Sequence, residues 1–115
     1  MIAGAALVSA PRAEAGPTLD AVKARGQLVC GVAAEVLGFT GAESQGRWSG
    51  LGVDICRATA AAIFSDAQKV KFVALDAAKR FPALQSGEVD VLASNSTFTL
   101  TRDTTLAVDF AGFYY

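Results

Sequence analysis

The chain of 115 residues contains no histidine, and this absence narrows its chemistry at once. Histidine is the commonest general acid or base in enzymes, so its usual role in catalysis is missing. The chain also lacks the glycine patterns of a nucleophile elbow or a phosphate-binding loop. Its two cysteines cannot complete a four-ligand zinc site without a histidine. We therefore expect no catalytic residue, no metal site and no cofactor.

A surplus of either charge is also missing. The chain has 10 Lys and Arg residues against 11 Asp and Glu residues, for a net charge of −1. This balance does not favour a nucleic-acid partner or an anionic membrane surface. No apolar run reaches the roughly 20 residues that cross a bilayer. Since 52% of the residues are hydrophobic, the chain has enough apolar material for one domain with a buried core.

Residues 1–15 differ from the rest of the chain. Ten small, mostly apolar residues come first, and the small-x-small triplet Ala13-Glu14-Ala15 follows shortly after. This pattern predicts a secretory signal peptide over 1–15 and export to the periplasm, although the positively charged n-region is missing. An alanine-rich tail is the alternative. In an oxidising compartment Cys30 and Cys56 can pair, but two small buried apolar side chains explain them equally well.

The apolar pattern predicts alternating helices and strands. A helix beginning at Thr18 is capped there and ends at Gly26, whereas the helix after Asp76 becomes regular only near Arg80 because Pro82 lacks an N–H. The order β-α-β-α-β favours an α/β fold with a parallel sheet and right-handed crossovers. The predicted helices cover 18–25, 52–64 and 77–85, the predicted strands 27–32, 70–75 and 89–93, and the predicted loops 33–50 and 94–102.

The loop after the third predicted strand, SNSTFTLTR, is the most informative segment for function. Ligands of open parallel sheets bind beyond the carboxyl ends of the strands. Arg102 can hold a carboxylate through two parallel hydrogen bonds, Thr97 offers an oxygen to an ammonium group, and Phe98 offers an apolar wall. These are the parts needed to bind a zwitterion. A solvated polar loop is the alternative explanation.

Four segments resemble, in order, the type 3 extracellular solute-binding proteins of polar amino-acid ABC transporters, and among these the general L-amino-acid-binding periplasmic proteins. The resemblance implies a periplasmic-binding-protein-like first lobe over 16–115, with the second lobe of a two-lobed clamshell absent. It also implies an amino-acid ligand and a permease partner in the inner membrane. The segments are TLDAVKARGQLVCGV, GRWSGLGVDICRATAAAIF, KVKFVALDAAKRFPALQSGEVDVL and TFTLTRDTTLAVDFAG.

The resemblance also assigns roles to single residues. Arg102 stands twelve residues after Asp90, the spacing of the family's arginine that binds the ligand α-carboxylate. The family's amide and hydroxyl contacts fall on Asn95 and Thr97, and Asp76 borders the family's cleft. Glu35, in the loop after the first strand, differs from the family and is expected to be an exposed acid.

Two departures set this chain apart from that branch. The segment Ala93-Ser94-Asn95-Ser96-Thr97-Phe98 stands where the branch usually has Ser-Arg-Asn-Thr-Thr-Trp, so an arginine and a tryptophan are replaced. The second departure is the absence of the second lobe. A single open lobe would leave more of the ligand surface in contact with water than a closed pocket does, so we expect weak binding. Two alternatives to a binding protein stay open, a non-functional gene fragment and a lobe of a cyclohexadienyl-dehydratase-like enzyme.

Overall fold

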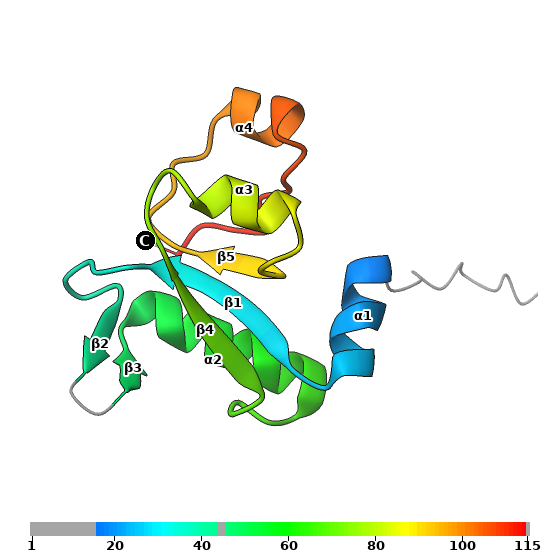
Figure 1. The fold of residues 1–115 in the computed structure, drawn as a ribbon, viewed down its shortest axis with the longest axis vertical. Helices are drawn as coiled ribbons and strands as arrows, with labels where there is room; N and C mark the ends of the chain where they lie inside the picture. The colour runs from blue at the N-terminus through cyan, green and yellow to red at the C-terminus, as the bar shows by residue number, and fades with distance from the viewer. Residues whose placement is uncertain (1–15, 44–45, 115) are drawn as a thin grey trace, which may run out of the picture.

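The structure is a computed structural model that describes residues 16–43 and 46–114, and it has an α/β fold built on a three-stranded parallel sheet (Figure 1). The predicted signal peptide lies outside the described residues. Strand β1 (Leu28–Ala33) is central, with β4 (Val70–Leu75) and β5 (Val91–Ala93) parallel to it on either side. The predicted fold class is confirmed. The remaining elements are α1 (Pro17–Arg25), β2 (Gly41–Glu43), β3 (Arg47–Ser49), α2 (Leu51–Phe64), α3 (Arg80–Gln85) and α4 (Leu100–Thr105).

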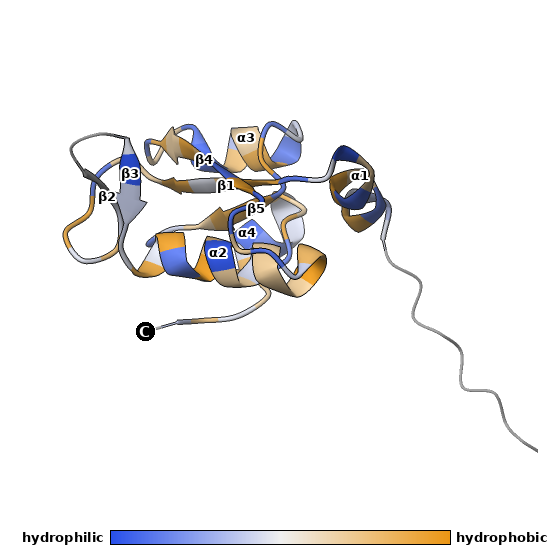
Figure 2. Ribbon diagram, turned by 90° about the horizontal axis from the view of Figure 1, so that it is seen from below, coloured by the Kyte–Doolittle hydropathy of each residue, from blue (hydrophilic) through white to orange (hydrophobic). Residues whose placement is uncertain are grey.

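Helices cover both faces of the sheet, with α2 on one side and α3 on the other (Figure 2). Successive side chains of a strand point to opposite faces, so β1 contributes to two separate cores. Cys30 and Val32 are fully buried and pack with Val53 and Cys56 of α2. On the opposite face, a Cβ atom at Gly31 would lie 2.9 Å from Leu75 Cδ1. A larger residue at this position would force the side chains beneath α3 to shift.

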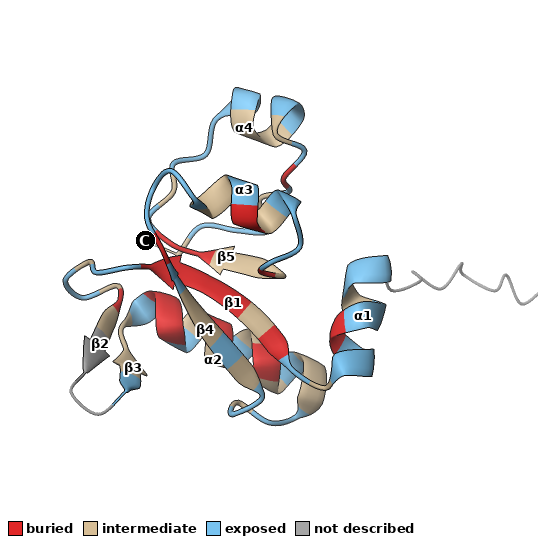
Figure 3. Cartoon of the chain, viewed as in Figure 1, coloured by how far each residue is buried: buried red, intermediate tan, exposed pale blue. Residues whose placement is uncertain are grey.

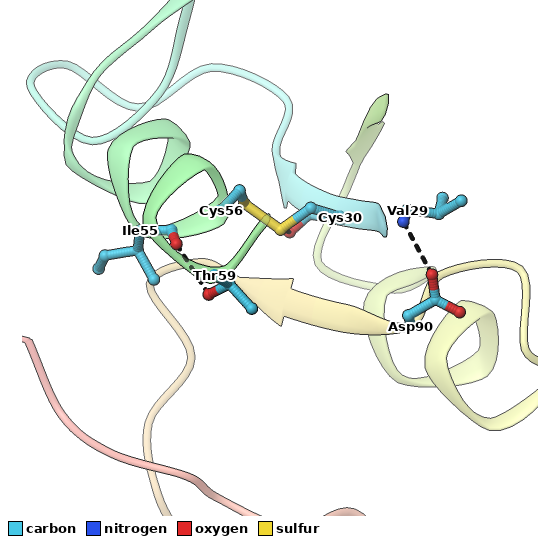
Figure 4. Close-up of a disulfide and its surroundings, with 7 residues drawn as sticks. Val29, Cys30, Ile55, Cys56, Thr59 and Asp90 are labelled. Atoms are coloured by element: carbon cyan, nitrogen blue, oxygen red, sulfur yellow. Dashed lines mark hydrogen bonds between the residues drawn. A yellow bond between two sulfur atoms is a disulfide. The ribbon is translucent and has the colours of Figure 1, made fainter. Parts of the chain in front are cut away.

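A disulfide joins the central strand to the helix that covers it (Figure 4). The Cα atoms of Cys30 and Cys56 are 6.0 Å apart, and both residues are 0% exposed. The pairing that the sequence leaves open is thus present in the structure. Because β1 is also the most continuously buried strand (Figure 3), the bond lies at the centre of the core.

Asp90 joins three segments at the end of the sheet where β1 and β5 begin. Its Oδ2 atom accepts a hydrogen bond of 2.8 Å from the backbone N–H of Val29 (Figure 4). The same atom forms an ion pair with Arg25. The Asp90 side chain is only 10% exposed, so this carboxylate is shielded on most sides. It fixes the end of α1 and the entry to β5 against the edge of β1.

Three local expectations are corrected. Thr18 is not a helix cap, because Gly16 occupies that position and Pro17, whose ring fixes a helical φ, starts the helix. The predicted loop 33–50 contains the antiparallel hairpin of β2 and β3, whose strands are too short to show a period of two. The predicted loop 94–102 ends in α4, whose N-cap Thr99 accepts from the Arg102 backbone N–H at 3.2 Å. Gly26 does end α1, with φ at 76°.

The disulfide gives a first prediction. Replacing both cysteines by alanine should lower the free energy of unfolding by about 3 kcal/mol, because the bond closes a loop with a sequence separation of 26 in the unfolded chain. Urea unfolding of the oxidised protein and of the double variant measures the difference. Wild-type protein whose disulfide has been reduced should show the same loss in free energy of unfolding. Equal stability of the oxidised protein and the variant would contradict this role.

Asp90 gives a second prediction. Asp90→Ala should destabilise the fold by about 1–2 kcal/mol, because the Val29 N–H loses its acceptor and Arg25 its partner. Asp90→Asn should cost less, since an amide oxygen still accepts from Val29. The exposed neighbour Glu88 is the control, because Glu88→Ala should change stability by less than about 0.5 kcal/mol. Similar urea midpoints for Asp90→Ala and Glu88→Ala would show that the junction is unimportant.

Candidate ligand-binding site

The candidate site lies where β1, β4 and β5 end, because the three loops that leave these ends meet at one edge of the sheet. The loop after β1 is held by the start of α2. The backbone N–H groups of Leu51 and Gly52 donate to the carbonyl oxygens of Gly38 and Phe39 at 3.2 and 2.9 Å. These donors of the α2 N-terminus are therefore used to fix a loop.

Arg102 connects the segments that follow β4 and β5. Its Nη1 atom donates to the carbonyl oxygen of Thr97 at 2.6 Å, and its Cζ atom lies 5.1 Å from the ring centroid of Phe81 at the start of α3. A guanidinium carries five N–H donors, so the bond to Thr97 leaves donors for a carboxylate. The side chain is half-buried, which is the setting in which a bidentate charged contact gains strength.

Hydroxyl groups shape the loop that leads to Arg102. Ser94 is buried at 8% exposure, and its Oγ atom lies 2.9 Å from Ser96 Oγ. Sequence reasoning missed both serines as structural residues, although the hydroxyl-rich loop was the available signal. Asn95 and Thr97, which the resemblance assigns to ligand contacts, are exposed. Buried Ser94 and half-buried Ser96 thus alternate with the exposed residues Asn95 and Thr97 in this part of the loop.

Phe98 belongs to an aromatic cluster with the last part of the chain. Its ring meets Phe110 edge-on at 5.0 Å between centroids and Phe113 at 5.8 Å. Phe98 stays 45% exposed, so part of its ring faces solvent. The sequence did not indicate this cluster, because no periodic pattern links Phe98 to the extended segment that brings the other two rings. Its role as an apolar wall stays a prediction.

Asp76 organises the turn that leads into α3. Its Oδ1 atom accepts from the backbone N–H groups of Ala78 and Lys79, both at 3.0 Å, and Oδ2 lies 3.4 Å from Lys79 Nζ. The regular helix begins at Arg80, as the position of Pro82 predicts. The hydrogen bond from the Lys79 backbone N–H is the main cause that lowers the pKa of the Asp76 carboxyl below its ordinary value of 3.8. Asp76 therefore caps a turn, and its contact with a ligand stays a prediction.

The candidate residues lie on an open surface. Two hollows, of about 480 and 450 Å³, lie away from these residues, the first beside Trp48 and Phe72 and the second beside Gln85 and Val108. Glu35 is exposed, as expected. Within 16–43 and 46–114, no three His, Cys, Asp or Glu residues gather as metal ligands, and no helix is long and apolar enough to span a bilayer. Among the candidate residues, Arg102 contacts Thr97 directly.

The sequence model of the bacterial extracellular solute-binding proteins, family 3, matches residues 28–115. The chain belongs to this family. It is 50% identical over 114 residues to the glutamate/glutamine/aspartate/asparagine-binding protein BztA of Rhodobacter capsulatus, covering 99% of this chain and 33% of that protein. It is 45% identical over 109 residues to the general L-amino acid-binding periplasmic protein AapJ of Rhizobium johnstonii, covering 95% of this chain and 32% of that one.

Solved structures of the family have the same fold. The periplasmic binding protein of an ABC transporter from Brucella ovis, with glutathione bound, is 56% identical with a TM-score of 0.84, over 88% of this chain and 32% of that one. Arginine-bound domain 1 of TmArgBP is 27% identical with a TM-score of 0.65, over 73% of this chain and 64% of that one. The chain spans about a third of the length of the curated relatives BztA and AapJ. The family resemblance predicted from the four segments is confirmed.

The Asp76 turn gives a third prediction. An NMR titration of its carboxyl carbon should show a pKa below 3.8, and Lys79→Met should raise that pKa only in part, because the backbone N–H stays. A depressed pKa stabilises the turn above pH 3.8, and this contribution disappears as the pH falls through the folded-state value. A pKa for Asp76 at or above 3.8 would contradict the hydrogen-bonded turn.

Proposed function

We propose that the chain binds L-amino acids in the periplasm as part of a solute-binding protein that delivers them to an ABC transporter. The family membership supports this, as do the names of two relatives, one binding glutamate, glutamine, aspartate and asparagine and the other L-amino acids in general. The observation that carries the proposal is the placement of Arg102 at the carboxyl end of the sheet, with its guanidinium held by Thr97 and Phe81.

The chemistry of a zwitterion matches the groups on this face. Arg102 binds the α-carboxylate through its remaining N–H donors, in the geometry of a bidentate pair. Thr97 and Asn95 add hydroxyl and amide contacts, with the Thr97 hydroxyl oxygen accepting from the α-ammonium group. Phe98 covers the apolar part of the ligand side chain. Binding occurs without reaction, since no histidine is present to act as general base.

The openness of the face sets the expected strength of binding. Ion pairs at a solvated surface contribute a median of about 0–1 kcal/mol, and a ligand on one face keeps much of its own surface in water. We expect a dissociation constant of about a millimolar for the chain alone. Arginine-bound domain 1 of TmArgBP supports binding by a single domain of this family.

Export and a membrane partner complete the proposal. Residues 1–15 act as the signal peptide that sends the chain to the periplasm. There it meets the permease of the transporter in the inner membrane. The relative AapJ is named a periplasmic protein, which supports this location.

Arg102 gives the fourth prediction. Arg102→Ala should weaken binding of L-glutamate, L-glutamine and L-alanine about fivefold or more, because a charged hydrogen bond to the shared α-carboxylate is lost. Arg102→Lys should recover part of the affinity, since it keeps the charge but not the planar fork. NMR shift titration of the amides in 94–102 measures dissociation constants in this range.

The matched control is Arg57→Ala on α2. Arg57 is also an arginine over an aromatic ring, 5.7 Å from the centroid of Phe72, but its guanidinium bonds Trp48 O and Asp54. Its removal should leave amino-acid binding unchanged. Equal affinity for wild type and Arg102→Ala would refute the carboxylate assignment. Turnover of a cyclohexadienyl substrate by the purified chain would refute binding without reaction.

A further inference from the structure

Phe81 and Arg102 meet across two helices that are separated along the chain. Phe81 lies in the first turn of α3 and Arg102 in α4, and the Arg102 Cζ atom lies 5.1 Å from the Phe81 ring centroid. Both side chains are half-buried. A cation this close to an aromatic face is attracted by the ring quadrupole, and the attraction increases as water is excluded.

We propose that Phe81 is a positioning residue that holds the Arg102 guanidinium ready for the ligand carboxylate. This inference rests on the proposed function and adds a residue to it. The Phe81 ring lies against the guanidinium, with Cζ 5.1 Å from the ring centroid, and the Thr97 carbonyl oxygen holds Nη1 at 2.6 Å. The guanidinium is thus held before the ligand arrives, which lowers the entropy lost on binding.

The surroundings of Phe81 make it a firm support. Its helix is anchored to the sheet by Ala83, which is 4% exposed and packs with Leu75 and Val89. At its start, α3 follows the Asp76 turn, and near its end Gln85 Nε2 donates to the carbonyl oxygen of Leu106 at 2.7 Å. Helices α3 and α4 are therefore tied at two places, with the ring contact at one and the amide contact at the other.

Another arginine and ring pair, in the described part of the chain, differs in its hydrogen bonds. Arg57 lies over Phe72, but two of its guanidinium nitrogens already bond Trp48 O and Asp54. In the described residues, Arg102 has one guanidinium bond, to Thr97. The two pairs share the ring contact and differ in the donors they leave for a ligand, so Phe72 is the matched control for Phe81.

The test compares L-glutamate affinity in the full chain by NMR shift titration. Phe81→Leu should weaken binding about threefold, Phe81→Tyr should keep wild-type affinity because the aromatic face stays, and Phe72→Leu should have no effect on binding. In the Arg102→Ala background, Phe81→Leu should weaken binding no further, because a positioning residue acts through Arg102. Thermal unfolding of each variant separates a loss of folded protein from a loss of affinity.

The outcomes distinguish the two proposals. If wild type binds no L-amino acid, the proposed function fails and Phe81 has no site to support. If wild type binds and Phe81→Leu binds equally well, the positioning role alone is wrong. A threefold loss from Phe81→Leu that persists without Arg102, or that Phe81→Tyr does not restore, would also overturn it, because the ring would then act by general packing.

Discussion

The burial of β1 is the constraint on which the other parts of the structure depend. This strand has a parallel neighbour on each edge and a helix over each face. Its residues must therefore form hydrogen bonds in two ladders and pack into two cores at once. Cys30 is joined to α2 by the disulfide with Cys56. Gly31 has no side chain on the opposite face, which leaves room for the apolar side chains beneath α3. Loosening β1 would release both covering layers together.

The parallel arrangement of the strands also determines where a ligand can bind. Parallel strands expose their carboxyl ends at one edge, and the fold uses the opposite edge for a shielded ionic junction at Asp90. The two ends of the sheet thus carry different tasks. At one end the Asp90 carboxylate is bonded to the Val29 N–H and Arg25. At the other end Arg102 forms one guanidinium hydrogen bond in the described residues, which in the proposed site leaves donors for a ligand.

Much of this architecture could be predicted from the sequence, because buried parallel strands and an amphipathic helix leave strong apolar patterns. The strand 70–75 and the start of regular helix near Arg80 agree with the structure residue by residue. The β2–β3 hairpin and α4 were missed for a physical reason. They contain too little of an apolar period to detect, and α4 depends on a local cap, in which Thr99 accepts from the Arg102 N–H. Helix α3 and strand β5 are equally short, but Pro82 and an apolar run marked them in the sequence.

The candidate site could also be predicted only in part. The residue types at Asn95, Thr97 and Arg102 were visible in the loop, because polar and charged groups after a buried strand stand out. The partners of those residues were not visible. Phe81 beneath Arg102, the Ser94–Ser96 pair and the rings around Phe98 come from distant segments or from local hydrogen bonding that no spacing rule encodes.

The two helices around Arg102 differ in how firmly they are held. In the proposed site the ligand carboxylate is bound by one residue, Arg102, but the position of its guanidinium depends on α3, which follows a different strand. Because α3 is anchored by Ala83 and α4 has no buried residue among Leu100–Thr105, the α3 side is the fixed one and the α4 side is the adaptable one. Arg102 lies on the adaptable side and takes its position from the fixed side, through Phe81. A face built in this way can keep one carboxylate contact while the loop that carries Asn95 and Thr97 changes in sequence.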